Sequence, residues 1–207
     1  MAYAFLKAFG LDGDIGTFTV DLNTSKMKTS KGHEVVGAKD GEFQIKSGRY
    51  PFCVCVPAGA KSANYPACEK DDPGKDSSIR SATTLIPFEQ ELNRLTLVAS
   101  GGKSENYRVT WGSESKSFTG DQLRHGVNLA EAFPSNPFCE AFGKVDAAIA
   151  AKQGYETKQI KELFRSPEAK AEMEAVAASS EKERETLVAA IKAAFVPVTH
   201  RIRIQAL

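Results

Sequence analysis

The stretch Ile15-Gly16-Thr17-Phe18-Thr19-Val20-Asp21-Leu22 alternates apolar and polar residues, and this alternation decides the fold class of the first half of the chain. Its apolar members Phe18, Val20 and Leu22 share one face of an extended strand, and the polar residues between them share the other. Such a pattern is typical of a strand that has one face in a core and one in solvent. We therefore predict a β-rich first half.

The same period of two continues to about Trp111 and predicts further strands. These are residues 33–38, 42–46, 49–56, 93–99 and 106–111. Glycine-containing turn signals such as Lys39-Asp40-Gly41 separate the runs. Strands at this spacing favour an antiparallel β-sandwich.

After Thr119 the apolar period lengthens to that of a helix. The predicted helices are residues 121–125, 137–164, a short one from 166, and 180–195. Thr119 and Ser166 stand at N-cap positions, and Pro167 follows at a first helical position. Ser180 with Glu183 three residues later predicts a capping box that opens the last helix.

Residues 197–207 alternate again, and we expect this final strand to rejoin the β layer. The predicted fold class is therefore α+β, an antiparallel β-sandwich with an inserted helical hairpin near the C-terminus. The expected organisation is a helix at 1–10, a β-sandwich at 11–136, a helical insertion at 137–196 and the final strand at 197–207.

Residues 1–10 predict a short amphipathic helix. Tyr3, Phe5, Leu6 and Phe9 form an apolar stripe at helical spacing, and we expect it to face a core. A helix this short is marginal in water by itself, so it must pack on something. If it does not pack on this chain, the exposed stripe predicts self-association.

Bulk composition excludes some partners. The net charge of +1 and the absence of a basic run with interleaved aromatics argue against nucleic acid. No run approaches the roughly 18 apolar residues that a bilayer span needs. Residues 1–10 lack the features of a signal peptide, so localisation stays open, as does an exported parent protein.

The four cysteines allow a disulfide, a metal site or buried thiols, and we favour buried thiols. Cys53 and Cys55 point to the same face of a predicted strand, which makes a disulfide between them geometrically poor. Cys68 lies in a polar stretch and is the candidate partner for one of them, Cys55 above all. A zinc site needs a second closely spaced Cys or His pair, which the sequence lacks.

Asp71, Asp72 and Asp76 are a weak candidate for a calcium site, since Pro73-Gly74-Lys75 interrupts them and the full ligand pattern is missing. We predict no cofactor, because neither a P-loop nor a Gly-x-Gly-x-x-Gly motif occurs.

Tyr107 and Trp111 fall on one face of a predicted strand, which allows two interpretations. An exposed Tyr/Trp platform would stack on sugar rings and bind carbohydrate. Alternatively, the only Trp lies in the core, and Val109 on the same face favours that interpretation.

No catalytic constellation is recognisable. A nucleophile elbow requires Gly-x-Ser-x-Gly, which is absent, and a Ser-His-acid triad requires a histidine beside a carboxylate. The only candidates are His33, His125 and His200, and we interpret each as structural.

Several stretches together resemble one enzyme family. They are Ala2-Tyr3-Ala4-Phe5-Leu6-Lys7-Ala8-Phe9-Gly10 with Gly13-Asp14-Ile15-Gly16, Tyr107-Arg108-Val109-Thr110-Trp111-Gly112, Asn136-Pro137-Phe138, Ala151-Lys152-Gln153-Gly154-Tyr155-Glu156-Thr157 and Pro197-Val198-Thr199-His200. Over nearly its whole length the chain resembles the C-terminal portion of bacterial SGNH/GDSL-type hydrolases. In that family a flavodoxin-like catalytic domain carries the serine in a Gly-Asp-Ser block and the Asp and His in an Asp-x-x-His block.

This chain contains neither block, nor Gly-x-Asn-Asp, so no catalytic residue is carried over from the family. The resemblance implies that residues 1–10 correspond to the last helix of a hydrolase domain lying upstream. The leading hypothesis is a non-catalytic accessory domain that binds or supports such a hydrolase, or a carbohydrate or ester ligand. The alternative is a stand-alone hydrolase acting on an ester, lactone or glycoside, with its site near the loop at residues 57–81.

Overall fold

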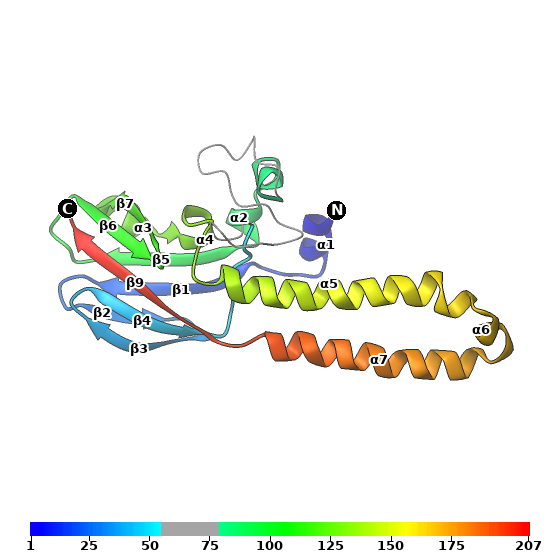
Figure 1. Ribbon diagram of the computed structural model, residues 1–207. Helices are drawn as coiled ribbons and strands as arrows, with labels where there is room; N and C mark the ends of the chain where they lie inside the picture. Colours follow the sequence, from blue (N-terminus) through cyan, green and yellow to red (C-terminus); the bar gives the residue numbers. More distant parts are fainter. Residues whose placement is uncertain (55–78) are drawn as a thin grey trace. The chain divides into compact units, whose positions relative to one another are not determined.

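The computed structural model describes residues 1–54 and 79–207. The chain divides into two compact units (Figure 1). Unit 1 comprises Met1–Glu140 and Pro197–Leu207, and unit 2 comprises Ala141–Val196. The fold is α+β, with two mostly antiparallel sheets and several helices.

The first sheet of unit 1 has the strand order β2-β1-β5-β8. Its strands are β1 (Asp14–Asp21), β2 (Lys26–Thr29), β5 (Arg94–Ser100) and β8 (Val127–Asn128). β1 and β5 pair in parallel, whereas the other two pairings are antiparallel. The parallel pair departs from the fully antiparallel arrangement that the sequence predicted.

The second sheet has the order β3-β4-β9-β6-β7 and is antiparallel throughout. Its strands are β3 (His33–Lys39), β4 (Glu42–Ser47), β6 (Asn106–Trp111), β7 (Glu114–Thr119) and β9 (Val198–Ala206). The last strand of the chain, β9, is central, because it pairs with β4 on one side and β6 on the other (Figure 1).

The core of unit 1 follows the alternating pattern of its strands. On β1 the buried side chains include Phe18 and Val20, while Thr19 and Asp21 are exposed. The other large, fully buried side chains come from both sheets and from nearby helices and loops: Phe43, Ile45, Leu95, Leu97, Trp111, Leu123, Leu129, Phe133, Phe138 and Ile202. Burial of this apolar area supplies the main driving force for the fold.

The strand predicted at residues 49–56 is wrong over its described part, because residues 49–54 form no strand. The backbone of Phe52 pairs instead with a side chain: its N–H donates to Oδ1 of Asn93 at 2.8 Å, and its carbonyl accepts from Nδ2 at 3.0 Å. Those two bonds take the place of a sheet ladder. The sequence also left out β2, β7 and β8, which are short or largely polar.

Short helices connect the strands of unit 1. They are α1 (Ala2–Ala8), the 3-10 helix Ile79–Thr84, α2 (Phe88–Glu91), α3 (Gly120–His125) and α4 (Leu129–Ala132). Thr119 caps α3 as predicted, and its side chain accepts from the N–H of Gln122 while the Gln122 side chain accepts from the N–H of Thr119. This reciprocal capping box satisfies two backbone donors at the helix start.

Helix α1 does not bury the stripe that the sequence predicted would face a core. None of its residues is buried, and Phe5 and Phe9 are 59% and 78% exposed. A polar contact holds the helix in place instead. The Tyr3 hydroxyl donates to the Glu91 carboxylate at 2.6 Å, and the Lys7 ammonium lies 2.9 Å from the same oxygen.

Unit 2 is built from two long helices and a connection. α5 (Cys139–Lys161), which starts at the end of unit 1, runs beside α7 (Met173–Ala194), and the 3-10 helix Leu163–Arg165 and α6 (Pro167–Ala171) join them (Figure 1). Ser166 caps α6 with Pro167 at its first position, as the sequence predicted.

The capping box predicted at Ser180 and Glu183 is wrong, because Ser180 lies inside α7. Its hydroxyl is buried and accepts from the Gln159 side chain of α5, and its carbonyl accepts from the Tyr155 hydroxyl at 3.2 Å. The serine therefore joins two helices rather than starting one. The alanine-rich sequence before it carries α7 back to Met173.

Candidate functional site

A buried chain of hydrogen bonds links Trp111, His200, Ser47 and His33 in the interior of unit 1. The Trp111 indole Nε1 donates to Nδ1 of His200 at 3.1 Å, and Nε2 of His200 lies 2.9 Å from Oγ of Ser47. The same Oγ lies 2.8 Å from Nδ1 of His33, whose Nε2 lies 3.0 Å from the backbone carbonyl of Ile15.

The two ends of this hydrogen-bond network determine which nitrogen of each imidazole carries the proton. An indole can only donate, so Nδ1 of His200 accepts and Nε2 carries the proton that is donated to Ser47. A carbonyl can only accept, so Nε2 of His33 is a donor to Ile15, and Nδ1 accepts from the Ser47 hydroxyl. Every polar atom is thus satisfied with both imidazoles neutral.

Burial enforces the neutral state. It lowers the pKa of His200 to about 3, and it lowers the pKa of His33, because a charged imidazole in this interior would lose its hydration. Ser47 is completely buried and His200 nearly so. The Ser-His contacts therefore form a satisfied structural network in which Ser47 has no access to a substrate.

The network also connects the two sheets of unit 1. Ile15 belongs to β1 of the first sheet, whereas His33, Ser47, His200 and Trp111 belong to the second. On the side facing His33, a Cβ added at Gly16 would lie 2.3 Å from Nε2. Only glycine leaves room for the imidazole at that position of β1.

A second buried cluster surrounds the carboxyl group of Glu89 on α2. Its Oε2 accepts from Nδ2 of Asn93 at 2.7 Å, and the backbone carbonyl of Glu89 accepts from Nδ2 of Asn128 at 2.9 Å. Burial raises the pKa of Glu89 to about 7, and the nearby Glu131 carboxylate adds to the shift. At neutral pH this carboxyl is therefore poised between its charged and neutral forms.

A third cluster joins Cys53 and Cys139 through Asn136. The Cys53 thiol lies 3.8 Å from Oδ1 of Asn136, and the backbone N–H of Asn136 donates to the Cys139 sulfur at 3.3 Å. The Cys139 thiol donates to the backbone carbonyl of Pro134 at 3.6 Å. Both cysteines are buried, and neither is part of a disulfide.

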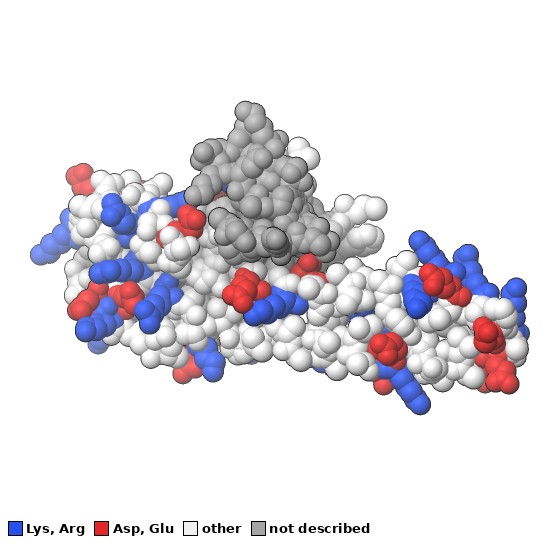
Figure 2. All heavy atoms as spheres, viewed as in Figure 1, with Lys and Arg blue, Asp and Glu red and all other residues white. Residues whose placement is uncertain are grey.

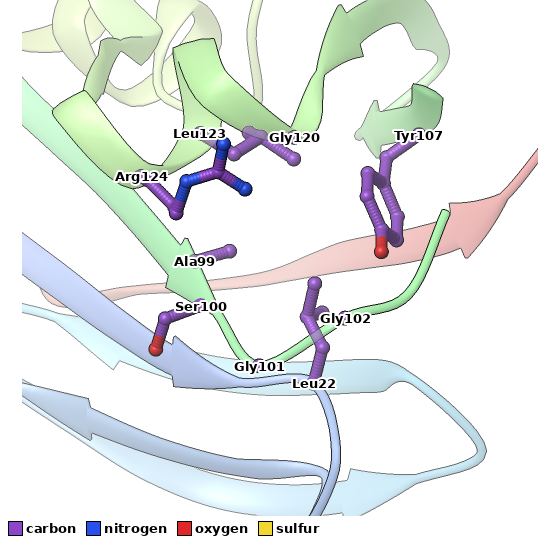
Figure 3. A pocket seen from close by; sticks show the side chains of 9 residues that line it. All are labelled: Leu22, Ala99, Ser100, Gly101, Gly102, Tyr107, Gly120, Leu123 and Arg124. Atoms are coloured by element: carbon purple, nitrogen blue, oxygen red, sulfur yellow. The ribbon is translucent and has the colours of Figure 1, made fainter. Parts of the chain in front are cut away.

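A small cavity lies where the ends of β1, β5, β6 and α3 meet. It is lined by Leu22, Ala99, Ser100, Gly101, Gly102, Tyr107, Gly120, Leu123 and Arg124 (Figure 3). Its volume is about 10 Å³, which holds a single water molecule and excludes a larger ligand. A Cβ at Gly102 would lie 2.0 Å from the Tyr107 hydroxyl, so this glycine makes room for the phenol.

The predicted carbohydrate platform is not formed by the residues proposed for it. Trp111 is fully buried between Phe133, Phe138 and His200, and Tyr107 is also buried. The rings point inward because both side chains lie on the face of β6 that is turned toward the core. A buried ring cannot stack on a sugar, so the interior interpretation of Trp111 is the one that its position supports.

Other predicted site residues lie outside the part of the chain that the structure describes. These are Cys55 and Cys68 of the proposed disulfide and Asp71, Asp72 and Asp76 of the proposed calcium site. Within residues 1–54 and 79–207, no group of three or more His, Cys, Asp or Glu side chains is arranged to hold a metal ion.

The sequence interpretation missed Ser47, Glu89 and Asn136. The sequence did contain a signal for Ser47, because this residue lies on the same core-facing side of β4 as Phe43 and Ile45. A small polar residue in an apolar phase needs a buried partner, and that requirement points to a polar network. Glu89 lies in the four-residue helix α2 and Asn136 lies in the connection between α4 and α5, and both segments are too short for a periodicity to mark a buried position.

Surface charge is mixed. Figure 2 shows Lys and Arg interspersed with Asp and Glu on the face in view, in agreement with the net charge of +1. Within the described residues, no helix is both long enough and apolar enough to cross a membrane.

Comparison with known proteins gives a likeness at the level of the fold. No family model and no curated protein matches the sequence. A solved structure described as BT4096, a gut microbial diltiazem-metabolizing enzyme, matches with a TM-score of 0.60 and 16% sequence identity. The match covers 100% of this chain and 53% of that one, so this chain spans about half the length of the enzyme.

Proposed function

We propose that this chain is an accessory module that supports a hydrolase-like catalytic domain, and that it contacts its partner through the exposed apolar residues of α1 and the turn after it. The observation that carries this proposal is the surface formed by Phe5, Phe9 and Leu11. Their side chains are 59%, 78% and 51% exposed on a helix that Glu91 ties to unit 1. Apolar side chains clustered on an anchored surface are typical of a protein contact.

Two further observations favour a supporting role. The Ser-His contacts of unit 1 are sealed in the interior and fully satisfied, which suits a scaffold rather than a nucleophile. The likeness to an enzyme about twice as long is compatible with a module that belongs to a larger hydrolase. The SGNH/GDSL-type family remains our proposal for that hydrolase, on the sequence resemblance alone.

We also propose the finer architecture in which the two sheets of unit 1 form a β-sandwich and unit 2 is a helical hairpin inserted before β9. Contacts between the sheets support the sandwich. Nε2 of His33 bonds the carbonyl of Ile15, and the Phe18 ring of β1 lies 5.1 Å and 5.9 Å from the rings of His33 and His200. Aromatic packing of this kind is typical of a core between two layers.

Charge substitution on α1 tests the contact. Because the apolar surface drives association, we expect the wild-type chain to self-associate when no partner is present, and we expect Phe5→Asp with Phe9→Asp to reduce its mass in light scattering to that of a monomer. Val36→Asp, at another exposed apolar residue, is the matched control and should leave the mass unchanged. A wild-type monomer at all concentrations contradicts the proposed surface.

Catalysis is tested separately with a chromogenic acetate ester and with diltiazem, the compound named for the similar enzyme. An accessory module should show no turnover above a boiled control. Turnover that a point substitution abolishes would instead support the alternative, a stand-alone hydrolase.

A further inference from the structure

The outward face of the five-stranded sheet is polar and carries basic side chains in an ordered pattern. On β9, Ile202 and Ile204 are buried, so Arg201 and Arg203 lie on the opposite face and are exposed. Because directly paired residues of an antiparallel ladder share a face, the registers with β4 and β6 identify the other outward residues. On these three strands they are Glu42, Gln44, Lys46, Asn106, Arg108, Thr110, Thr199, Arg201, Arg203 and Gln205.

Four of these side chains form a diagonal row across β4, β9 and β6. In order along the row they are Lys46, Arg201, Arg203 and Arg108. Lys46 pairs with Thr199, two residues before Arg201. Arg108 pairs with Gln205, two residues after Arg203. Neighbours at such offsets are about 7–8 Å apart, so the row spans roughly 20 Å of the sheet.

Acidic side chains neutralise only part of this row. Two strand residues of the same face are acidic, Glu42 on β4 and Glu34 on β3, which pairs with Lys46. The Glu42 carboxylate lies 3.6 Å from Arg201 and pairs across the ladder with the other arginine of β9. Within residues 1–54 and 79–207, Arg108 forms no ion pair. Like charges in a row repel one another, and an anionic ligand along the row would remove that repulsion.

The composition of the face favours a sugar polymer as the anion. Guanidinium groups bind carboxylates in a bidentate manner, and the side chains of Gln44, Thr110 and Gln205 beside the row offer hydrogen bonds to sugar hydroxyls. The outward residues of β4, β6 and β9 include no apolar or aromatic side chain. A protein partner needs an apolar or aromatic anchor, a single-stranded nucleic acid stacks its bases on aromatic rings, and a membrane surface takes up apolar side chains.

We propose that this row is a binding surface for a linear polysaccharide that carries carboxylate groups. The polymer lies along the row, and its carboxylates bind the guanidinium groups of β9 and β6. None of these residues belongs to α1, so the inference goes beyond the hydrolase contact proposed above and does not rest on it.

Binding to end-biotinylated oligogalacturonate, measured by biolayer interferometry, tests the surface. We expect the wild-type chain to bind, the affinity to fall as salt is added, and uncharged dextran not to compete. Free dextran sulfate, single-stranded DNA and anionic phospholipid vesicles are the competitors that represent other polyanions. No binding of the wild-type chain at low salt overturns the proposal, and so does a competitor that binds more tightly than oligogalacturonate.

Variants locate the binding on the row. Arg201→Gln with Arg203→Gln should weaken binding about tenfold or more, because two charge-assisted hydrogen-bond donors are lost. The matched control is Lys26→Gln with Lys28→Gln, which removes the same charge from two exposed residues of β2 in the other sheet and should change the affinity by less than about twofold. An equal loss in both double variants overturns the proposal.

Arg108→Gln is a second, independent variant, because it breaks no ion pair and lies on another strand of the same face. It should also weaken binding, and an unchanged affinity would overturn the assignment of the row. Circular dichroism checks that each variant is folded.

Discussion

Ser47 occupies a position that the alternation of β4 assigns to an apolar side chain, following Phe43 and Ile45. The hydroxyl is tolerated there because one oxygen serves two imidazoles, accepting from His200 and donating to His33. A buried donor or acceptor without a partner costs about 1–3 kcal/mol. This residue therefore affects stability through the two groups it satisfies.

Replacing Ser47 by Ala should lower the free energy of unfolding by about 2 kcal/mol, because it leaves a donor of His200 and an acceptor of His33 unpaired. Urea unfolding followed by the fluorescence of Trp111 measures the change, since that indole is bonded to His200. The matched control is Ser117→Ala on the exposed part of β7, which should change the free energy by less than about 0.5 kcal/mol. Equal effects of the two substitutions would show that the network carries no stability.

Helix α7 starts earlier than its sequence predicts. A serine followed three residues later by an acid predicts a helix start, yet Ser180 lies in the interior of α7. Its hydroxyl meets the Gln159 side chain of α5, and the contact is buried. Among the described residues of unit 2, few side chains are buried, and Gln159 and Ser180 are two of them, so this polar contact is a buried link between the two helices.

A double-mutant cycle on Gln159→Ala and Ser180→Ala measures that contact. Each single change should destabilise unit 2 by about 1 kcal/mol, partly offset by the higher helix propensity of alanine. Because both changes remove the same bond, the double variant should fall short of the sum by about 1 kcal/mol. Urea unfolding followed by far-ultraviolet circular dichroism gives the values.

The matched cycle uses Thr157→Ala and Thr186→Ala, two exposed residues that bond only within their own helices. These changes should add without coupling. Full additivity of the Gln159 and Ser180 changes would contradict a stabilising contact.

For the molecule as a whole, two kinds of buried group make stability respond to pH in opposite directions. His200 has its pKa lowered to about 3, so below about pH 6.5 the unfolded chain binds a proton that the folded chain does not bind. The free energy of unfolding therefore decreases as pH falls from about 6.5 toward 3. Glu89 has its pKa raised to about 7, so the fold retains a proton that the unfolded chain releases above its ordinary pKa. That contribution is lost as pH rises toward 7.

Glu89→Gln separates the two effects. The amide is neutral at every pH and keeps an oxygen for Asn93, so the variant should lack the loss of stability that the wild-type chain shows between about pH 4.5 and 7. At pH 8 it should be more stable than wild type by up to about 3 kcal/mol. Chemical denaturation at pH 5 and pH 8 gives the comparison, with exposed Glu105→Gln as the control. The same difference between wild type and variant at both pH values would exclude Glu89 as the titrating group.

The amino-acid sequence by itself determined most of the elements. Alternation located β1, β3, β4, β5, β6 and β9 closely, and local capping chemistry identified the starts of α3 and α6, because each signal lies within a few residues of the element it predicts. The inward position of Trp111 and the structural role of the histidines were also among its interpretations.

Only the tertiary structure decided which partners those elements meet. The parallel pairing of β1 with β5, the replacement of a strand at residues 49–54 by the Asn93 side chain, and the exposure of Phe5 and Phe9 all depend on segments distant in sequence. The same holds for the contacts of Ser47 with two histidines and of Cys53 with Asn136. A hydrogen bond depends on the distance between two groups in space, and periodicity along one strand or helix carries no information about that distance.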